Sequence, residues 1–159
     1  MSVPYMIRPA RAEDISCLVA FRRCMFESMG VHDGVALAAM ESAVGAYLND
    51  ALPGGTYHGW VADVDGQVVG CGGLIVQQLP PSPRNLDGRQ GYILNIYTVP
   101  DWRDHGIATA IVQAMLDYLR EIGVPVATLH ATEAGRPIYE RFGFAPTNEM
   151  RLFLNGKQP

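Results

Sequence analysis

The sequence predicts an α/β (α+β) domain in which helices flank a mixed, mostly antiparallel central sheet. Two apolar segments, 57–64 and 67–79, flank Asp65-Gly66, a dipeptide that is typical of a two-residue β-hairpin turn. A strand–helix–strand unit follows, and such a unit places its two strands parallel to each other. The members of this unit are residues 92–99, 107–122 and 126–130. The hairpin and the crossover together therefore predict a sheet with both kinds of pairing.

The first 55 residues are expected to form a short strand and two helices. Tyr5–Arg8 is apolar enough for a strand, which Pro9 closes. A helix then runs to Gly30, with apolar residues at helical spacing. These residues are Ile15, Leu18, Val19, Met25, Phe26 and Met29. Asp33 is a suitable N-cap for a second helix, which the run from Pro53 to Gly55 is expected to stop.

The second half is expected to alternate between strands and helices. After the hairpin, residues 80–88 form a polar, proline-rich connection that is expected at the surface. The β-branched and aromatic run 92–99 predicts a strand that ends at Pro100. Apolar residues every three or four positions predict the helix over 107–122. Thr132 is expected to cap a brief helix that stops at Gly143. Two final edge segments are expected at 144–146 and 150–154.

Length and composition indicate one globular domain. The chain has 159 residues, of which 48% are hydrophobic and 18% charged, and no run approaches the ~20 apolar residues of a membrane span. The net charge of −4 and the single lysine, Lys157, argue against nucleic acid as a partner. Three cysteines and four histidines show no metal-type spacing, so no metal site is expected. These features favour a cytoplasmic protein that acts on a small molecule, with no membrane or nucleic acid partner.

An anion site is predicted where the strand at 92–99 turns into the helix. The connection Arg103-Asp-His-Gly106-Ile-Ala108 contains two very small residues, Gly106 and Ala108. A strand that turns through such residues into a helix presents several unpaired backbone N–H groups at the positive end of the helix dipole. Small side chains let a phosphate approach those groups closely.

The pattern Arg103-x-x-Gly106-x-Ala108 resembles the pyrophosphate loop of the GNAT superfamily of N-acetyltransferases. A second segment, 129–144, resembles the part of this family in which a short strand leads to a helix that carries a tyrosine, here Tyr139, with Gly-Phe four residues later. The element order is similar to the GNAT fold over nearly the whole chain. The resemblance therefore implies a single domain, 1–159, whose mixed sheet contains a splayed parallel pair.

This resemblance implies an enzyme that moves an acetyl group from acetyl-CoA to an amine of a small molecule or peptide, by direct attack in a ternary complex. It makes the backbone N–H of Ile96 the group that polarises the carbonyl, and Tyr139 the general acid that returns a proton to the leaving thiolate. The positions implied in binding acetyl-CoA are Tyr97, Thr98, Val99, Arg103, Asp104, His105, Gly106, Ile107, Ala108, Thr109 and Thr132. Relatives are often dimers, so a homodimer is among the partners that the resemblance suggests.

The general base is the position at which this chain departs from the family. Many relatives place a glutamate on the central strand, whereas the same register here holds Tyr92 and no carboxylate occurs from there to Val99. Glu27 on the first helix is a candidate base, although a solvated surface glutamate has the same sequence signature. Glu149 is a comparable candidate, and His130 could relay a proton because it ends a strand close to the expected cleft. Deprotonation through water is a further alternative.

Two function classes remain open. The first is the N-acetyltransferase, with an acceptor pocket expected between the first two helices and the 80–90 loop. The second is a non-catalytic module that binds acyl-CoA, which the missing strand glutamate favours and the presence of Tyr139 disfavours. A Rossmann dehydrogenase is disfavoured because no Gly-x-Gly-x-x-Gly follows an early strand, and Walker and Gly-x-Ser-x-Gly motifs are also missing.

Overall fold

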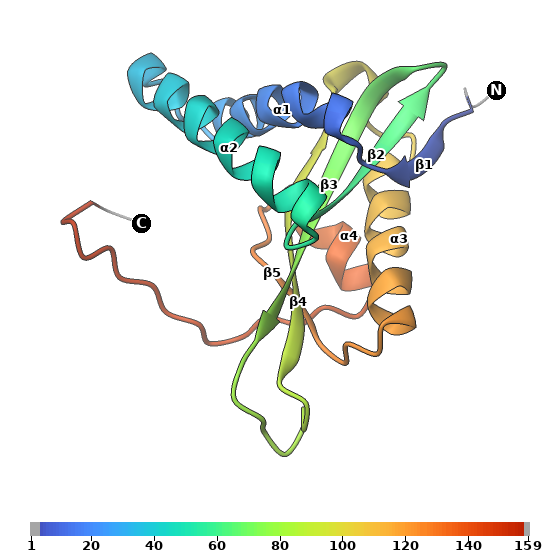
Figure 1. Ribbon diagram of the computed structural model, residues 1–159, viewed down its shortest axis with the longest axis vertical. Coiled ribbons are helices and arrows are strands. Elements are labelled where there is room, and N and C mark those ends of the chain that lie inside the picture. Colours follow the sequence, from blue (N-terminus) through green and yellow to red (C-terminus); the bar gives the residue numbers. More distant parts are fainter. Residues whose placement is uncertain (1–3, 158–159) are drawn as a thin grey trace.

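The computed structural model describes residues 4–157 and consists of a five-stranded sheet with helices on both of its faces (Figure 1). The strands are β1 (Met6–Pro9), β2 (His58–Val64), β3 (Gln67–Gln78), β4 (Arg89–Thr98) and β5 (Ala127–Leu129). The helices are α1 (Ile15–Ser28), α2 (Gly34–Gly54), α3 (Ile107–Glu121) and α4 (Arg136–Arg141), with two short 3₁₀ turns, η1 (Ala12–Asp14) and η2 (Pro100–Trp102). The strands and helices predicted up to Gly143 are present, with small shifts at their ends.

The sheet is mixed, as the hairpin and the crossover predicted. Its strand order is β1-β2-β3-β4-β5, with antiparallel pairing throughout except between β4 and β5, which are parallel. The parallel pairing covers only three positions of β4, from Gly91 to Ile93. Because β4 continues to Thr98 whereas β5 ends at Leu129, the two strands part beyond Ile93. The splayed parallel pair is therefore a feature of this structure.

A β-bulge interrupts β4 in its splayed half. Leu94 pairs with Gly73 and Tyr97 pairs with Cys71, so two residues of β4, Asn95 and Ile96, lie opposite a single residue of β3. Asn95 adopts a left-handed backbone with φ of 58°. A bulge bends its strand and takes backbone groups out of the ladder, so the edge of β4 changes direction at this point.

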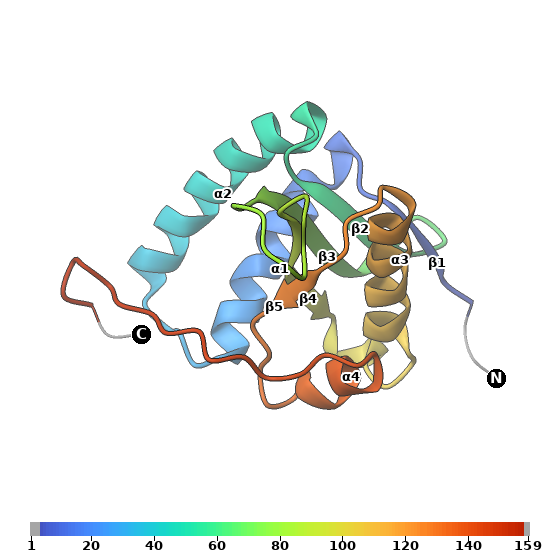
Figure 2. The ribbon, with the colours of Figure 1, turned by 90° about the horizontal axis from the view of Figure 1, so that it is seen from below.

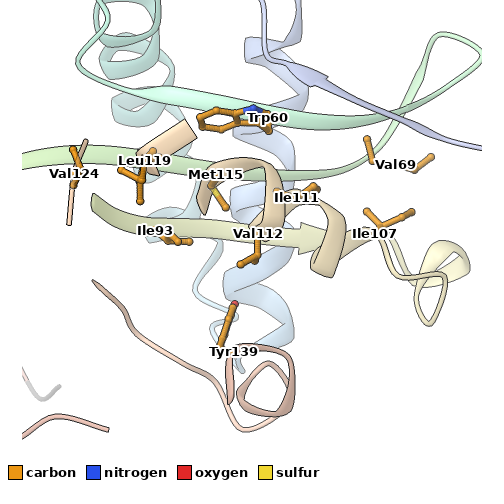
Figure 3. Packing of buried hydrophobic residues seen from close by; sticks show 12 residues of the cluster. Trp60, Val69, Ile93, Ile107, Ile111, Val112, Met115, Leu119, Val124 and Tyr139 are labelled. Carbon is orange, nitrogen blue, oxygen red and sulfur yellow. The ribbon is translucent and has the colours of Figure 1, made fainter. Parts of the chain in front are cut away.

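The helices form one layer on each face of the sheet. α1 and α2 cover one face, and α3 and α4 lie on the other (Figures 1 and 2). α3 buries its apolar stripe against the sheet, with Ile111, Val112 and Met115 fully buried (Figure 3). This close packing depends on Gly72 of β3, because a Cβ at that position would lie 2.5 Å from Cγ2 of Ile111. The position of α3 fixes the bend that precedes it.

The second helix begins and ends where the sequence predicted. Asp33 caps its start, because Oδ1 accepts hydrogen bonds from the N–H groups of Val35 and Ala36, each at 3.1 Å. Pro53 lies in the last turn, where it removes one helical N–H donor, and the helix ends one residue later at Gly54. Gly55 then adopts φ of 75° and ends the helix.

The prediction of edge segments at 144–146 and 150–154 is wrong. No residue from 130 to 157 is in a strand, and the segment after α4 extends away from the sheet (Figure 1). Met150 and Leu154 are 94% and 93% exposed. An alternating apolar pattern becomes a strand only when a neighbouring edge pairs with it, and this segment pairs with no strand of the described chain.

At the turn that leads into the last helix, a capping contact predicted for Thr132 is present, since the N–H of Arg136 binds the carbonyl of Thr132 at 2.9 Å. Its hydroxyl accepts a hydrogen bond from the N–H of Gly135 at 3.1 Å, whereas α4 begins only at Arg136. Thr132 therefore supports the turn that precedes α4. No helix within residues 4–157 has the length and apolar character needed to span a membrane.

Candidate active site

The connection between β4 and α3 presents a row of backbone N–H groups without protein partners. Within the described chain, the N–H of Arg103 binds the carbonyl of Pro100, and the next N–H with a backbone or side-chain acceptor is that of Ala110, which binds Gly106 at 3.0 Å. Asp104 and Gly106 have φ of 63° and 78°, and these left-handed residues turn the chain sharply into α3. The resulting bend can accept an anion at the N-terminus of a 15-residue helix.

Arg103 braces the bend against the end of β4. Its Nε donates a hydrogen bond to the carbonyl of Thr98 at 3.2 Å, and its guanidinium lies over the ring of Tyr97, 5.8 Å from the centroid. The backbone carbonyl of Arg103 lies 2.7 Å from Nδ1 of His105. These contacts hold the side chain across the strand edge and leave the N–H row of the bend uncovered.

The open edge of β4 leads from this bend to the bulge. Beyond Ile93 no strand of the described chain pairs with this edge, although β4 continues through Tyr97 and Thr98. An unpaired strand edge offers backbone donors and acceptors to an extended ligand. Ile96 lies at the bulge, where the ladder to β3 is interrupted. The bend, the open edge and the bulge thus form one continuous line of backbone groups.

Tyr139 projects from α4 toward β4 (Figure 3). The residue is 9% exposed and packs edge-on against Phe144, with ring centroids 6.0 Å apart. Burial raises the pKa of the Tyr139 hydroxyl above its ordinary value. The side chain is therefore protonated at neutral pH and can donate a proton or a hydrogen bond. The aromatic packing expected for this helix is present, and it leaves the Tyr139 hydroxyl able to donate a proton.

A cavity of about 660 Å³ lies beside Tyr139, and its lining includes the polar side chains of His130, Glu149 and Arg151. His130 Nε2 lies 3.2 Å from Oε1 of Glu149, and Nη2 of Arg151 lies 2.8 Å from His130 Nδ1. The ring of Tyr92 packs edge-on against His130, with centroids 5.7 Å apart. The fold thus brings two proton-transfer candidates, which the sequence suggested separately, into direct contact near Tyr139.

Glu27 has different surroundings. Its carboxylate accepts a hydrogen bond from Arg23 Nε at 2.8 Å, and Arg23 also binds Glu41 of α2 at 3.0 Å. The side chain of Glu27 is 41% exposed and does not line the cavity beside Tyr139. Glu27 is thus paired with Arg23 and lies apart from that cavity.

The structure also reveals a polar cluster at the bulge that sequence reasoning missed. The side-chain Oδ1 of Asn95 accepts a hydrogen bond from Arg22 of α1, and its Nδ2 donates one to the hydroxyl of Tyr57 at 3.1 Å. The only available signal was an asparagine inside a β-branched and aromatic strand, a residue type that tolerates left-handed backbone. Among residues 4–157, no group of three or more His, Cys, Asp or Glu side chains is arranged to hold a metal ion.

Comparisons with known proteins identify the family. The profile of the Acetyltransferase (GNAT) family matches residues 32–144. A curated relative, N-alpha-acetyltransferase 30 of Schizosaccharomyces pombe, is 37% identical over 71 residues, which are 42% of this chain and 47% of that protein. The chain thus spans about half the length of the curated relatives that it matches.

Two solved structures resemble the whole chain. A GCN5-related N-acetyltransferase from Ralstonia eutropha JMP134 has a TM-score of 0.89 and 36% identity, and the match covers 96% of this chain and 100% of that one. A predicted acetyltransferase from Clostridium acetobutylicum, solved with acetyl-CoA, has a TM-score of 0.88 and 29% identity, with coverage of 98% and 100%.

Proposed function

Because the chain belongs to the GNAT family of acetyltransferases, we propose that it transfers an acetyl group from acetyl-CoA to the amine of a small molecule or peptide. The observation that carries this proposal is the row of N–H groups between Arg103 and Ala110 that make no hydrogen bond within the described chain. The row adjoins the open edge of β4 and lies on the same side of the sheet as Tyr139.

Acetyl-CoA supplies the acyl group as a thioester, and the chain supplies complementary backbone groups. The N–H row of the bend would bind the diphosphate, because it combines free donors with the positive end of α3. The open edge of β4 at Tyr97 and Thr98 would bind the pantetheine arm as an added strand does. Val99 would border this arm, because its own N–H and carbonyl bind Val69 and Trp102. The turn at Thr132 lies before α4 and is the last position proposed to contact the cofactor.

The bulge and Tyr139 would carry out the chemistry at the thioester. The N–H of Ile96 would donate to the carbonyl oxygen, which stabilises negative charge as it develops during attack. Tyr139 would return a proton to the leaving thiolate, and its raised pKa supports that role because the hydroxyl remains protonated. The amine would lose its proton to His130, Glu27 or Glu149, or through water. Attack would then take place directly within a ternary complex of enzyme and both substrates.

Two measurements test the proposal in sequence. Isothermal titration calorimetry should detect binding of coenzyme A, and the affinity should fall when Ala108, at the start of α3, is replaced by a larger side chain (Ala108→Val) that crowds the N–H row. Release of free thiol from acetyl-CoA should then be measured across a panel of primary amines. Turnover of at least one amine is the expected result. No affinity for coenzyme A would overturn the whole proposal, whereas binding without turnover of any amine would identify a non-catalytic acyl-CoA-binding module.

A further inference from the structure

Arg22 of α1 is a half-buried cation that has no counter-charge within the described chain. Its guanidinium binds the neutral side-chain amide of Asn95 and lies over the ring of Phe26, 5.1 Å from the centroid. No carboxylate of residues 4–157 forms an ion pair with it. The adjacent Arg23, by contrast, pairs with two carboxylates, those of Glu27 and Glu41. Arg22 is therefore held in place by neutral groups, and its charge is not compensated.

The three nitrogens of the Arg22 guanidinium differ in burial and in hydrogen bonding. Nε is fully buried and has no hydrogen-bond acceptor, whereas Nη1 donates to Asn95. Nη2 also makes no hydrogen bond with the described chain, but unlike Nε it retains exposed surface. A guanidinium at low dielectric interacts strongly with an anion, and a carboxylate matches its planar geometry. Nη2 is thus the accessible end of a fixed and uncompensated cation.

Through Asn95, Arg22 lies close to the point at which the acceptor amine would attack. Asn95 directly precedes Ile96, the residue proposed to polarise the acetyl carbonyl, and both belong to the bulge. Asn95 is itself fixed, because its Nδ2 donates a hydrogen bond to the hydroxyl of Tyr57, and Tyr57 is a buried residue with 2% of its surface exposed. A group bound to Arg22 would therefore be held on the α1 side of the reaction centre, between the helix and the bulge.

We infer that Arg22 binds the carboxylate of the acceptor, so that the substrate class is primary amines that carry a carboxylate close to the amino group, such as α-amino acids. This inference rests on the proposed acetyl transfer. The chain as a whole is acidic, with a net charge of −4, so the selectivity for an anionic acceptor would arise locally at Arg22. A carboxylate on Nη2 would supply the missing counter-charge and orient the amine toward the thioester.

The test compares α-amino acids with their own carboxamides in the thiol-release assay. The wild type should use the acid with a kcat/KM at least 10-fold above that of the amide, because a charge-assisted hydrogen bond contributes about 10- to 100-fold. The amino group of a carboxamide loses its proton more readily, so this comparison works against the expected preference. Arg22→Gln should lose the preference through a lower rate on the acid alone, and Arg22→Lys should restore part of it. Arg11→Gln removes an exposed arginine and should change neither rate.

A second readout requires no turnover. In the presence of coenzyme A, the acid should raise the melting temperature of the wild type more than the amide does, and Arg22→Gln should abolish this difference. The inference would be overturned if acid and amide gave the same kcat/KM and the same rise in melting temperature. It would also be overturned if Arg22→Gln lowered kcat/KM equally for both substrates. If coenzyme A still binds in these cases, only the role of Arg22 is excluded and the proposed acetyl transfer is not contradicted. Absence of coenzyme A binding overturns the proposed function itself.

Discussion

The carboxylate of Glu149 lies 3.2 Å from Nε2 of His130, although 19 residues separate them in the chain. Glu149 belongs to the segment after α4, whereas His130 directly follows β5. Their contact forms in the cavity that Tyr139 also lines. A carboxylate that accepts from one ring nitrogen orients an imidazole. Because Arg151 can only donate, Nδ1 is the ring nitrogen that carries the lone pair, and His130 can accept a proton there once Arg151 moves aside.

We predict that His130→Gln lowers kcat by about 10- to 100-fold, because the amine then loses its proton acceptor. Glu149→Gln should give a smaller loss, since the ring keeps a hydrogen-bond partner of the same shape. Thiol release at saturating substrates measures both effects. Glu133→Gln is the control, because that side chain is 94% exposed. A base at Glu27 predicts the opposite ranking, with Glu27→Gln far more damaging than His130→Gln.

Replacing Gly106 by alanine should weaken coenzyme A binding by at least 10-fold. The added Cβ would lie beside the N–H row that the diphosphate is proposed to approach. The left-handed backbone at this position, with φ of 78°, adds a stability cost of about 1 kcal/mol. Calorimetry with coenzyme A and urea denaturation measure the two effects separately.

Gly30→Ala provides a matched control for that experiment. Gly30 also has a left-handed backbone, with φ of 93°, and its Cβ would meet no other atom within 4 Å. This variant should lose about 1 kcal/mol of stability as well, yet bind coenzyme A normally. Equal affinities of the two variants would show that the bend does not bind the diphosphate.

Tyr139→Phe should lower kcat by roughly 10- to 10³-fold, the range of a typical acid–base contribution. The ring packing against Phe144 is retained, so the melting temperature should change little. Because burial raises the pKa of this tyrosine, it loses its proton only above the pH of about 10 at which an exposed tyrosine does. Full kcat in the variant, under conditions in which chemistry limits the rate, would exclude Tyr139 as the acid.

Acid should destabilise the fold through Asp14. Arg8 donates two hydrogen bonds to this carboxylate, at 2.8 and 3.0 Å, and lowers its pKa below the ordinary value. The unfolded chain regains a pKa of about 3.9, so the stabilisation is complete above that pH and is lost as pH falls through the lower, folded-state value. Asp14→Asn should therefore cost roughly 2–4 kcal/mol at pH 7, and less at pH 2.

Urea denaturation at the two pH values measures this difference. Asp117→Asn is the control, since Asp117 and its partner Arg120 are 61% and 67% exposed and such pairs contribute under about 1 kcal/mol. An Asp14→Asn variant whose stability deficit is the same at both pH values would contradict the argument.

The local elements of the fold could be predicted because their causes lie within a few residues. The Asp65-Gly66 turn, the apolar stripe of α3 and the small residues around Gly106 each depend on backbone preferences and periodicity over short stretches. These features alone indicated the mixed sheet and the bend between β4 and α3. The same local reasoning failed at Met150–Leu154, where alternation suggested a strand but no neighbouring edge is available to pair with it.

Long-range packing decided what the sequence left open. The length of the splay depends on where β5 stops beside β4, and the bulge depends on the register between β3 and β4. Only the folded chain shows that His130 meets Glu149 and that Arg22 reaches Asn95 without a carboxylate partner. Composition and periodicity specify which faces are buried, but contacts between residues tens of positions apart depend on how the layers pack. The sequence determined the elements and the bend, and the tertiary structure decided which side chains surround the proposed reaction centre.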